Sequence, residues 1–275
     1  MDIKIELIVG FHNETHETLD FRLTETDIAE IADNFGSYHV LEMGRHYREY
    51  AITPFSILLP SAASKPFPAS SQFRPLPGKL RGGAITGNIG ECATAWVART
   101  VLFIPARGIV HATRTNKKCP DFVFHIDRSL ENQSHLEVSK LAKQRLYRTA
   151  KWWPVEAKAS DCLSGVKSAE KDGFLQLIHF WWNFAYQAQL SGNAYSAIAE
   201  GAGFGMLIGF VYQEEALKNL PRPRQIRLTI CFPKSYCACL AVIKKLLAYQ
   251  TDKDAEVLVD DKSFMDLFCD GDRRV

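Results

Sequence analysis

Residues 152–158 read Trp152-Trp153-Pro154-Val155-Glu156-Ala157-Lys158 and set a carboxylate and an amine inside an apolar run. In an extended strand alternate side chains share one face, so Glu156 and Lys158 point to the same side and Ala157 to the other. The apolar neighbours predict a buried strand, where charged groups are costly unless they bind something. The stretch therefore predicts a polar site on a strand inside a sheet. The alternative reading is an exposed strand face.

A second carboxylate follows a proline at the start of another strand-like run, Asp121-Phe122-Val123-Phe124. If the two runs are neighbours in one sheet, Asp121 and Glu156 lie within reach of a single ion. Oxygen ligands of this kind suit Mg²⁺ or Mn²⁺. Such an ion generates a hydroxide nucleophile and neutralises phosphoryl charge, while the Lys158 ammonium orients water or stabilises the transition state. Phosphodiester hydrolysis fits this set best, although Pro-Asp is also ordinary turn chemistry.

The pattern Pro120-Asp121 followed by Glu156-Ala157-Lys158 resembles the signature of the PD-(D/E)XK nucleases, the restriction-endonuclease-like superfamily. Members often carry a further acidic residue on the helix before the first core strand, and the stretch 87–91, ending in Glu91, is similar to that element. The resemblance covers about residues 81–232. It implies Asp121 and Glu156 as metal ligands, Lys158 as the catalytic lysine and Glu91 as an auxiliary metal ligand. By its sequence context alone, Glu91 also fits a solvated helix position.

The stretch after Lys158 adds a weaker likeness. Some superfamily members that act in recombination and repair carry a glutamine and an aromatic residue on the helix after the catalytic lysine, and Gln176 with Phe180 resembles that pair loosely. The resemblance adds Gln176 to the catalytic set, whereas a helical glutamine beside apolar residues is otherwise typical of a boundary position. His111 and His125 fall on predicted paired strands, where a lone histidine is more often structural than catalytic.

Hydrophobic periodicity predicts an α/β chain with elements in the order helix, three strands, helix, strand. This is the order of the superfamily's common core, so the resemblance implies a restriction-endonuclease-like core. The predicted helices span 85–103 and 172–190, and the strands 108–113, 121–126, 152–158, 205–213 and 224–232. The interval from Asp121 to Glu156 is too long for a direct turn between strands. It is predicted to hold an inserted amphipathic helix at 136–150.

Four segments are expected along the chain. Residues 1–53 form a small N-terminal α/β extension with a strand at 3–9 and a helix at 24–35, and residues 54–80 form a Pro/Ser-rich linker or wrapping arm that holds six of the twelve prolines. The nuclease core takes residues 81–250. Residues 251–275 form an acidic C-terminal tail, whose apolar patch at 264–268 is expected to dock on the body or on a partner.

The net charge of +2 does not indicate nucleic-acid binding, so a DNA surface has to come from local clusters of basic residues. Charge runs are usually solvated faces, yet these flank the predicted site in sequence. The candidate DNA-binding residues are Lys117, Lys118, Lys140, Lys143, Arg145, Arg148 and Lys151.

The seven cysteines are odd in number and widely scattered, which favours reduced thiols and a cytoplasmic protein. An iron–sulfur cluster at Cys231, Cys237 and Cys239 is disfavoured because the chain has no Cys-x-x-Cys pair. No apolar run reaches the roughly twenty residues of a membrane helix. The N-terminus carries acidic residues and does not read as a signal peptide.

These observations predict a Mg²⁺-dependent deoxyribonuclease, an endonuclease that the resemblance places in restriction or anti-phage defence. Expected partners are DNA, a helicase/ATPase or methyltransferase, and a second copy in a homodimer. Two alternatives stay open: a nucleic-acid-binding or assembly subunit of a helicase/ATPase complex that is inactive alone, and an RNA-directed nuclease.

Overall fold

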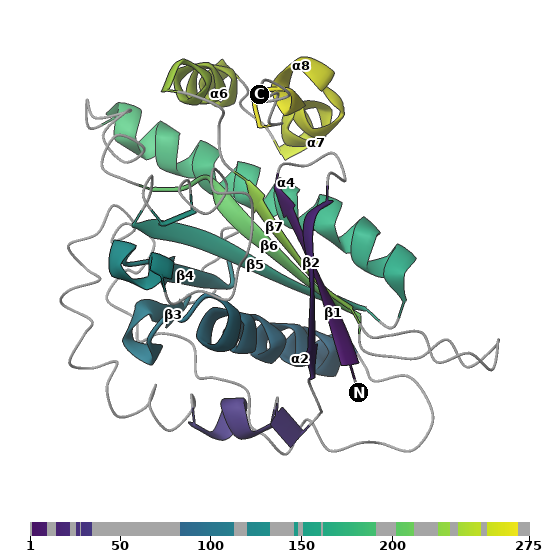
Figure 1. The fold of residues 1–275 in the computed structure, drawn as a ribbon. Coiled ribbons are helices and arrows are strands. Elements are labelled where there is room, and N and C mark those ends of the chain that lie inside the picture. The colour runs from purple at the N-terminus through teal and green to yellow at the C-terminus, as the bar shows by residue number, and fades with distance from the viewer. Residues whose placement is uncertain are drawn as a thin grey trace.

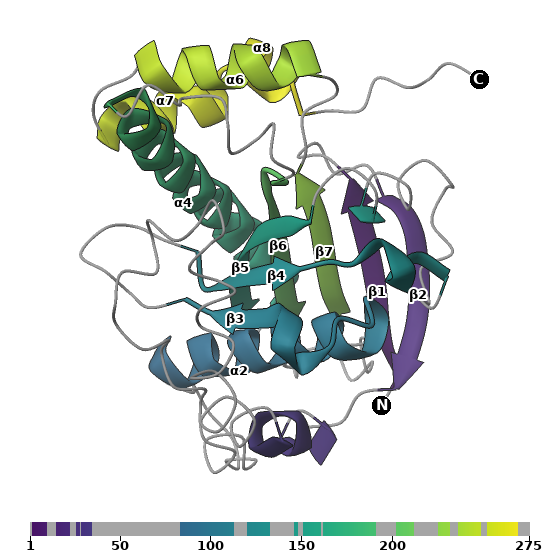
Figure 2. The same ribbon diagram turned by 90° about the vertical axis from the view of Figure 1, so that its left-hand side faces the viewer.

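A computed structural model describes most of the sheet and its helices. The described residues are 2–9, 15–22, 26–27, 29–34, 83–112, 120–132, 146–147, 151–160, 162–190, 202–211, 225–231, 236–248 and 252–268. Within these residues, seven strands form one mixed sheet in the order β2-β1-β7-β6-β5-β4-β3 (Figure 2). Their bounds are β1 Asp2–Val9, β2 Thr15–Arg22, β3 Ile109–His111, β4 Phe122–His125, β5 Trp152–Ser160, β6 Gly205–Val211 and β7 Gln225–Cys231. The chain is therefore an α/β protein, as predicted.

The strands of the sheet pair in both senses. β3, β4 and β5 are successively antiparallel, β5 and β6 are parallel, and β6 and β7 are antiparallel. A parallel pair needs a crossover, and the long helix α4, Leu163–Leu190, connects β5 to β6. With helix α2, Gly83–Trp96, the chain order is α2, β3, β4, β5, α4, β6. This is the predicted order of helix, three strands, helix and strand.

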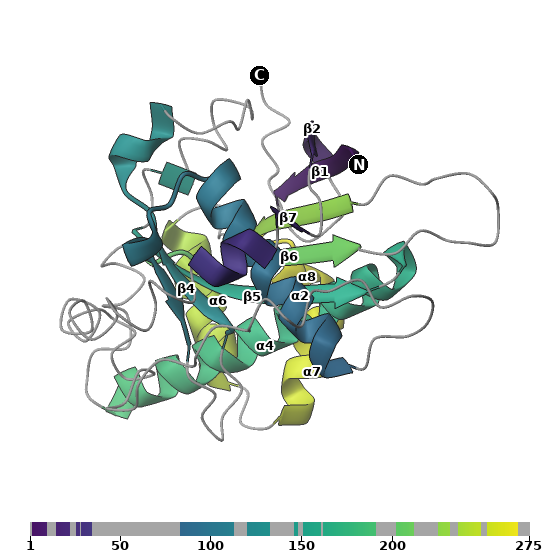
Figure 3. The same ribbon diagram turned by 90° about the horizontal axis from the view of Figure 1, so that it is seen from below.

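Helices cover both faces of the sheet. α2 lies against one face, where Figure 3 shows it crossing the strands, and α4 lies against the other. Three further helices, α6 Tyr236–Ala248, α7 Asp252–Asp260 and α8 Lys262–Met265, form an outer layer beyond α4 (Figure 1). The described helical structure also includes a π-helical turn at Val97–Val101 and short 3₁₀ turns at Ala106–Gly108 and Arg128–Asn132. Residues 26–27 and 29–34, inside the predicted helix at 24–35, and residues 146–147 are helical as well.

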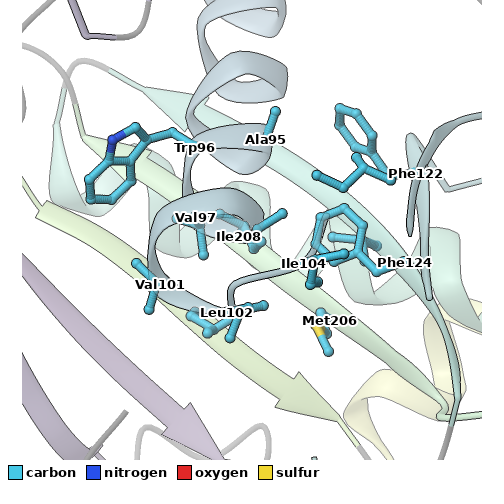
Figure 4. Close-up of a cluster of buried hydrophobic side chains, with 14 of the residues drawn as sticks. Ala95, Trp96, Val97, Val101, Leu102, Ile104, Phe122, Phe124, Met206 and Ile208 are labelled. Carbon is cyan, nitrogen blue, oxygen red and sulfur yellow. The ribbon is translucent and has the colours of Figure 1, made fainter. Parts of the chain in front are cut away.

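The core beneath α2 follows from strand alternation. Val155 and Ala157 of β5 point toward α2, as do Phe122 and Phe124 of β4, so Glu156 is left to face the α4 side. Figure 4 shows the two phenylalanines packed with the end of α2 and the π-helical turn. Burying a phenylalanine fully stabilises the fold by about 1.5–3 kcal/mol relative to leaving it exposed. This core fixes which face of β5 carries the charged residues.

A second core lies on the α4 side and includes the C-terminal helices. Phe268 packs its ring against Phe174 of α4 and against Phe204, at centroid distances of 5.5 and 4.5 Å, while Phe264 and Met265 are also buried. The apolar patch at 264–268 therefore docks on the body. Within the predicted acidic C-terminal tail, residues 252–260 and 262–265 are helical.

Several boundaries differ from the expectations. α4 begins at Leu163 rather than at residue 172. The sequence pattern missed its first turns because they carry mainly small and charged residues, although Val166 there is fully buried. Strand β2 and helix α6 were not predicted. β1 pairs in parallel with β7, so the N-terminal strands continue the same sheet. Residues 54–80, and all of the predicted insert at 136–150 except the helical pair 146–147, lie outside the described residues.

In the part of the chain that the structure describes, no helix combines the length and the apolar character needed to cross a membrane.

Candidate functional site

Two carboxylates from neighbouring strands meet at one end of β4. The antiparallel register pairs Phe122 with Val155, so one step further along the ladder Asp121 stands opposite Glu156. Oδ2 of Asp121 accepts a hydrogen bond from the backbone N–H of Ala157 at 3.0 Å. The negative charge of Asp121 contributes to a raised pKa at Glu156, which it can do only at short range. The structure thus brings together the two acidic residues that the sequence pattern selected.

Glu156 is buried and incompletely satisfied. Its residue is 2% exposed, and burial is the main cause of a pKa well above the ordinary value for glutamate, with Asp121 adding to the effect and Lys158 opposing it. Oε1 receives the Lys158 ammonium at 2.5 Å, whereas no hydrogen-bond partner reaches Oε2 within the described residues. A buried carboxylate oxygen beside a second carboxylate requires a proton or a cation. These two residues can therefore share a proton or hold a cation.

Lys158 joins the strand to the helix above it. Its Nζ donates to Glu156 Oε1 and, at 3.1 Å, to Oε1 of Gln176 on α4. The lysine side chain keeps 18% of its surface exposed, so it is mostly but not fully buried. Gln176 thus lies beside the predicted catalytic lysine, as the sequence likeness implied. Two strands and one helix supply this group of Asp121, Glu156, Lys158 and Gln176.

Glu91 has a different neighbour. Its Oε2 lies 3.0 Å from Nε2 of His111, and both side chains are buried. Among the residues with described positions, no group of three or more His, Cys, Asp or Glu side chains gathers closely enough to hold a metal ion. The expected set of three carboxylates, with Glu91 as the third, is therefore not assembled. His125 is also apart from the site, because it pairs with Trp152 at the other end of β4 and the two rings are 4.4 Å apart.

The basic residues proposed for DNA binding are mostly beyond what the structure describes. Lys117, Lys118, Lys140, Lys143, Arg145 and Arg148 fall outside the described residues. Lys151 is described and exposed, directly before β5, at the end of that strand away from Lys158. It is therefore not part of the cluster around Glu156.

One buried ion pair near the site was not predicted. Across the sheet, Lys158 pairs with Gly209 of β6, and Gly209 pairs with Arg227 of β7. Arg227 Nε lies 2.9 Å from Oε1 of Glu170 on α4, and their residues are 3% and 9% exposed. Gly209 leaves room for them, since a β-carbon there would lie 3.2 Å from Glu170 Oε1 and 2.6 Å from a methyl of Val166. The signal in the sequence was a single arginine within the apolar run 226–231.

Comparison of the chain with protein-family models, with curated proteins and with solved structures finds no match. The chemistry of the site therefore has to be inferred from its own residues. Two adjoining carboxylates, one with an unpartnered buried oxygen, can hold a hard cation. An ammonium fixed beside them can donate to an oxygen that develops negative charge.

Proposed function

We propose that this chain is a metal-dependent nuclease that hydrolyses DNA phosphodiester bonds on a restriction-endonuclease-like core. The observation that carries the proposal is the convergence of Asp121 and Glu156 with the Lys158 ammonium 2.5 Å from one carboxylate oxygen. A role in binding alone would not require two acidic side chains that repel phosphate. The helix, strand and helix order around these residues also agrees with the superfamily that the sequence pattern resembles.

Each residue has a defined role in this proposal. Asp121 and Glu156 would hold Mg²⁺ or Mn²⁺, which supplies charge neutralisation and an acidified water when bound. Lys158 donates a hydrogen bond to the attacking water or to a phosphoryl oxygen, which stabilises the charge that develops there. Gln176 accepts from the same ammonium and so fixes its direction. Ala157 holds the Asp121 carboxylate through its backbone N–H.

The biological setting rests on resemblance. Superfamily members with this signature act widely in restriction and anti-phage defence, so we place the activity there as an endonuclease acting on DNA. RNA shares the same phosphodiester chemistry. A comparison of DNA and RNA substrates of one sequence therefore belongs in the test.

The proposal is tested by cleavage. Purified protein with Mg²⁺ or Mn²⁺ is expected to nick or cut supercoiled plasmid DNA, and Glu156→Ala or Lys158→Ala is expected to abolish the cleavage. Lys171→Ala is the matched control, because Lys171 is an exposed lysine of α4 that pairs with Asp260 outside the site. Equal cleavage by the wild type and both site variants would remove the assignment, and cleavage of RNA alone would redirect it.

One observation favours a second candidate, a nucleic-acid-binding or assembly subunit that is inactive alone. Lys158 already neutralises one oxygen of Glu156, and the described residues offer the pair no third acidic or histidine ligand. Both features lower the affinity for a cation. Titration calorimetry separates the candidates: Mn²⁺ binding that is lost in Glu156→Ala supports the nuclease, and its absence in the wild type supports the binding subunit.

A further inference from the structure

We propose that Gly90 and Glu91 of α2, together with His111 of β3, form a positioning device. From the α2 face of the sheet, it holds in place the two strands that carry Asp121 and Glu156. The inference rests on the proposed nuclease function and deepens it. It assigns Glu91 a role in placing Asp121 rather than in binding the metal. The three residues lie on the face of the sheet opposite to Glu156.

The buried pair of Glu91 and His111 is the centre of this device. The exposed fractions of their side chains are 4% and 0%, and Glu91 Oε2 lies 3.0 Å from His111 Nε2. Removing one partner of a buried polar pair leaves the other without compensation, which is strongly destabilising. The contact thus ties α2 to β3, the outermost strand of the β3–β4–β5 unit. That strand is only three residues long, and its Ile109 also packs in the core under α2.

The pair acts on Asp121 through the β3–β4 ladder. His111 is the cross-strand partner of Phe122, and their rings stack with centroids 4.7 Å apart. The next residue, Ala112, donates its backbone N–H to the carbonyl oxygen of Asp121 at 2.8 Å. The main chain of Asp121 is therefore bonded to the strand that Glu91 anchors. The Asp121 carboxylate in turn accepts a hydrogen bond from the backbone N–H of Ala157. The bonds to Ala112 and to Ala157 together fix the position of Asp121.

Gly90 places the same helix against β5. A β-carbon at Gly90 would lie 3.1 Å from Cβ of Ala159 and 3.2 Å from the carbonyl carbon of Lys158. A side chain at this position would push α2 and β5 apart by a few tenths of an ångström. One turn of α2 thus packs against the backbone of β5 at Lys158 through Gly90. The same turn contacts β3 through Glu91. The two supports together set the relative position of Asp121 and Glu156.

The faces of the sheet argue against Glu91 as a ligand of the same ion. His111 stacks on Phe122, which belongs to the core under α2, whereas Glu156 lies against Gly173 of α4. The Glu91 carboxylate is therefore directed to the α2 side of the sheet. A positioning role and a ligand role predict different consequences when Glu91 is changed, and this difference defines the experiment.

The experiment compares Glu91→Ala, Glu91→Gln, His111→Ala and the double alanine variant with Cys92→Ala as control. Cys92 is a fully buried neighbour on α2, so its truncation removes core packing while Gly90, Glu91 and His111 all keep their side chains. The first readout is amide hydrogen exchange at Ala112 and Ala157 in metal-free protein, because both amides bond to Asp121. The second readout is kcat together with the Mn²⁺ dissociation constant.

We expect exchange at both amides to rise about 10- to 100-fold in Glu91→Ala and in His111→Ala, with no further rise in the double variant. We expect kcat to fall by a similar factor, as displacement of a reacting group by about 1 Å does, while the Mn²⁺ dissociation constant stays within twofold. Glu91→Gln keeps a side-chain oxygen for the histidine and is expected to restore most of kcat.

Two results would overturn the device. If Glu91→Gln and Glu91→Ala weaken Mn²⁺ binding equally, Glu91 is a metal ligand. If the amides of Ala112 and Ala157 exchange no faster in the Glu91 and His111 variants than in Cys92→Ala, the pair is only a general stabiliser of the fold. Failure of the proposed function is a separate result, seen as a wild type that neither binds Mn²⁺ nor cleaves nucleic acid. The hydrogen-exchange measurement requires neither Mn²⁺ binding nor cleavage, so it still decides whether the device exists.

Discussion

Gly173 of α4 lies so close to Glu156 of β5 that a β-carbon at position 173 would be 3.2 Å from Cγ of the glutamate. The same β-carbon would be 3.3 Å from Cε of Lys158. A glycine in the middle of a helix costs about 1 kcal/mol relative to alanine. Its presence in α4 is explained by space, because any larger residue presses on both charged side chains of the site.

Gly173→Ala is therefore expected to lower kcat about tenfold while leaving the melting temperature unchanged or slightly higher. The gain in helix propensity offsets the crowding, because the side chains of Leu207, Glu156 and Lys158 that the new β-carbon meets can shift by a few tenths of an ångström. A shift of that size at reacting groups is costly for the rate. Plasmid cleavage and thermal unfolding measure the two effects.

Gly87→Ala is the matched control for this substitution. Gly87 is also a helical glycine, on α2, and a β-carbon there meets nothing within 4 Å. The variant is expected to be stabilised with unchanged kcat. If the Gly173→Ala variant is as active as Gly87→Ala, the side chains of Glu156 and Lys158 tolerate the added methyl group without loss of rate.

The hydrogen bond from Lys158 to Gln176 predicts a loss of rate without a loss of binding. A hydrogen bond to a charged group is worth about 1.5–3 kcal/mol, and each 1.4 kcal/mol changes a rate about tenfold. Gln176→Leu should thus lower kcat about 10- to 100-fold with little change in KM, and Gln176→Glu, which keeps an acceptor oxygen, should lose less. Asn183→Leu is the control, because the Asn183 amide donates only within α4, to the carbonyl of His179.

The raised pKa of Glu156 predicts how stability depends on pH. A carboxyl whose pKa is higher in the folded than in the unfolded state, where it is about 4.3, binds its proton more tightly when folded. The stabilisation that this tighter proton binding gives the folded state is therefore fully present below the unfolded pKa and is lost as the pH rises through the folded pKa. Burial and then Asp121 raise the pKa of Glu156, so its ionisation destabilises the metal-free fold.

Glu156→Gln removes this titration. In EDTA the variant is expected to match the wild type near pH 4 and to have the larger free energy of unfolding at pH 8. Urea unfolding across this range measures the difference. A variant less stable than the wild type at pH 8 would contradict the assignment of Glu156 as a group strained by its own charge.

The buried pair of Arg227 and Glu170 predicts a large effect on stability. Arg227→Met leaves the Glu170 carboxylate buried without its cation and is expected to cost about 3–5 kcal/mol in the free energy of unfolding. Adding Glu170→Leu should recover most of the loss, because an apolar pair replaces a charged one. Lys171→Ala, which breaks the exposed pair with Asp260, should cost less than about 1 kcal/mol. Equal effects of Arg227→Met and Lys171→Ala would contradict the prediction.

The sequence predicted the centre of the site because strand geometry is local. Alternation along residues 152–158 decides that Glu156 and Lys158 share a face, and the apolar run after Asp121 predicts a neighbouring strand. Both inferences need only a period of two. Whether Asp121 lies opposite Glu156 depends on register, which the sequence suggested through the signature alone and which the structure supplies.

The partners of Glu91 and Arg227 could not be predicted in the same way. Glu91 meets a residue of the next strand along the chain, whereas Arg227 meets a helix much earlier in the chain. Whether either contact exists depends on how closely a helix approaches the sheet. That approach is set by Gly90 in one case and by Gly209 in the other. A glycine inside a helix or strand signals a close approach but does not name the element on the other side.

The parallel contact between β1 and β7 links folding to the order of synthesis. β1 is synthesised well before β7, Gln225–Cys231, which is its parallel partner, so the edge of β1 that does not pair with β2 stays open until β7 has left the ribosome. Such an edge readily pairs with other extended chains. Nascent copies held close together on one messenger are therefore exposed to mispairing, and slow elongation before residue 225 would lower the yield of native protein.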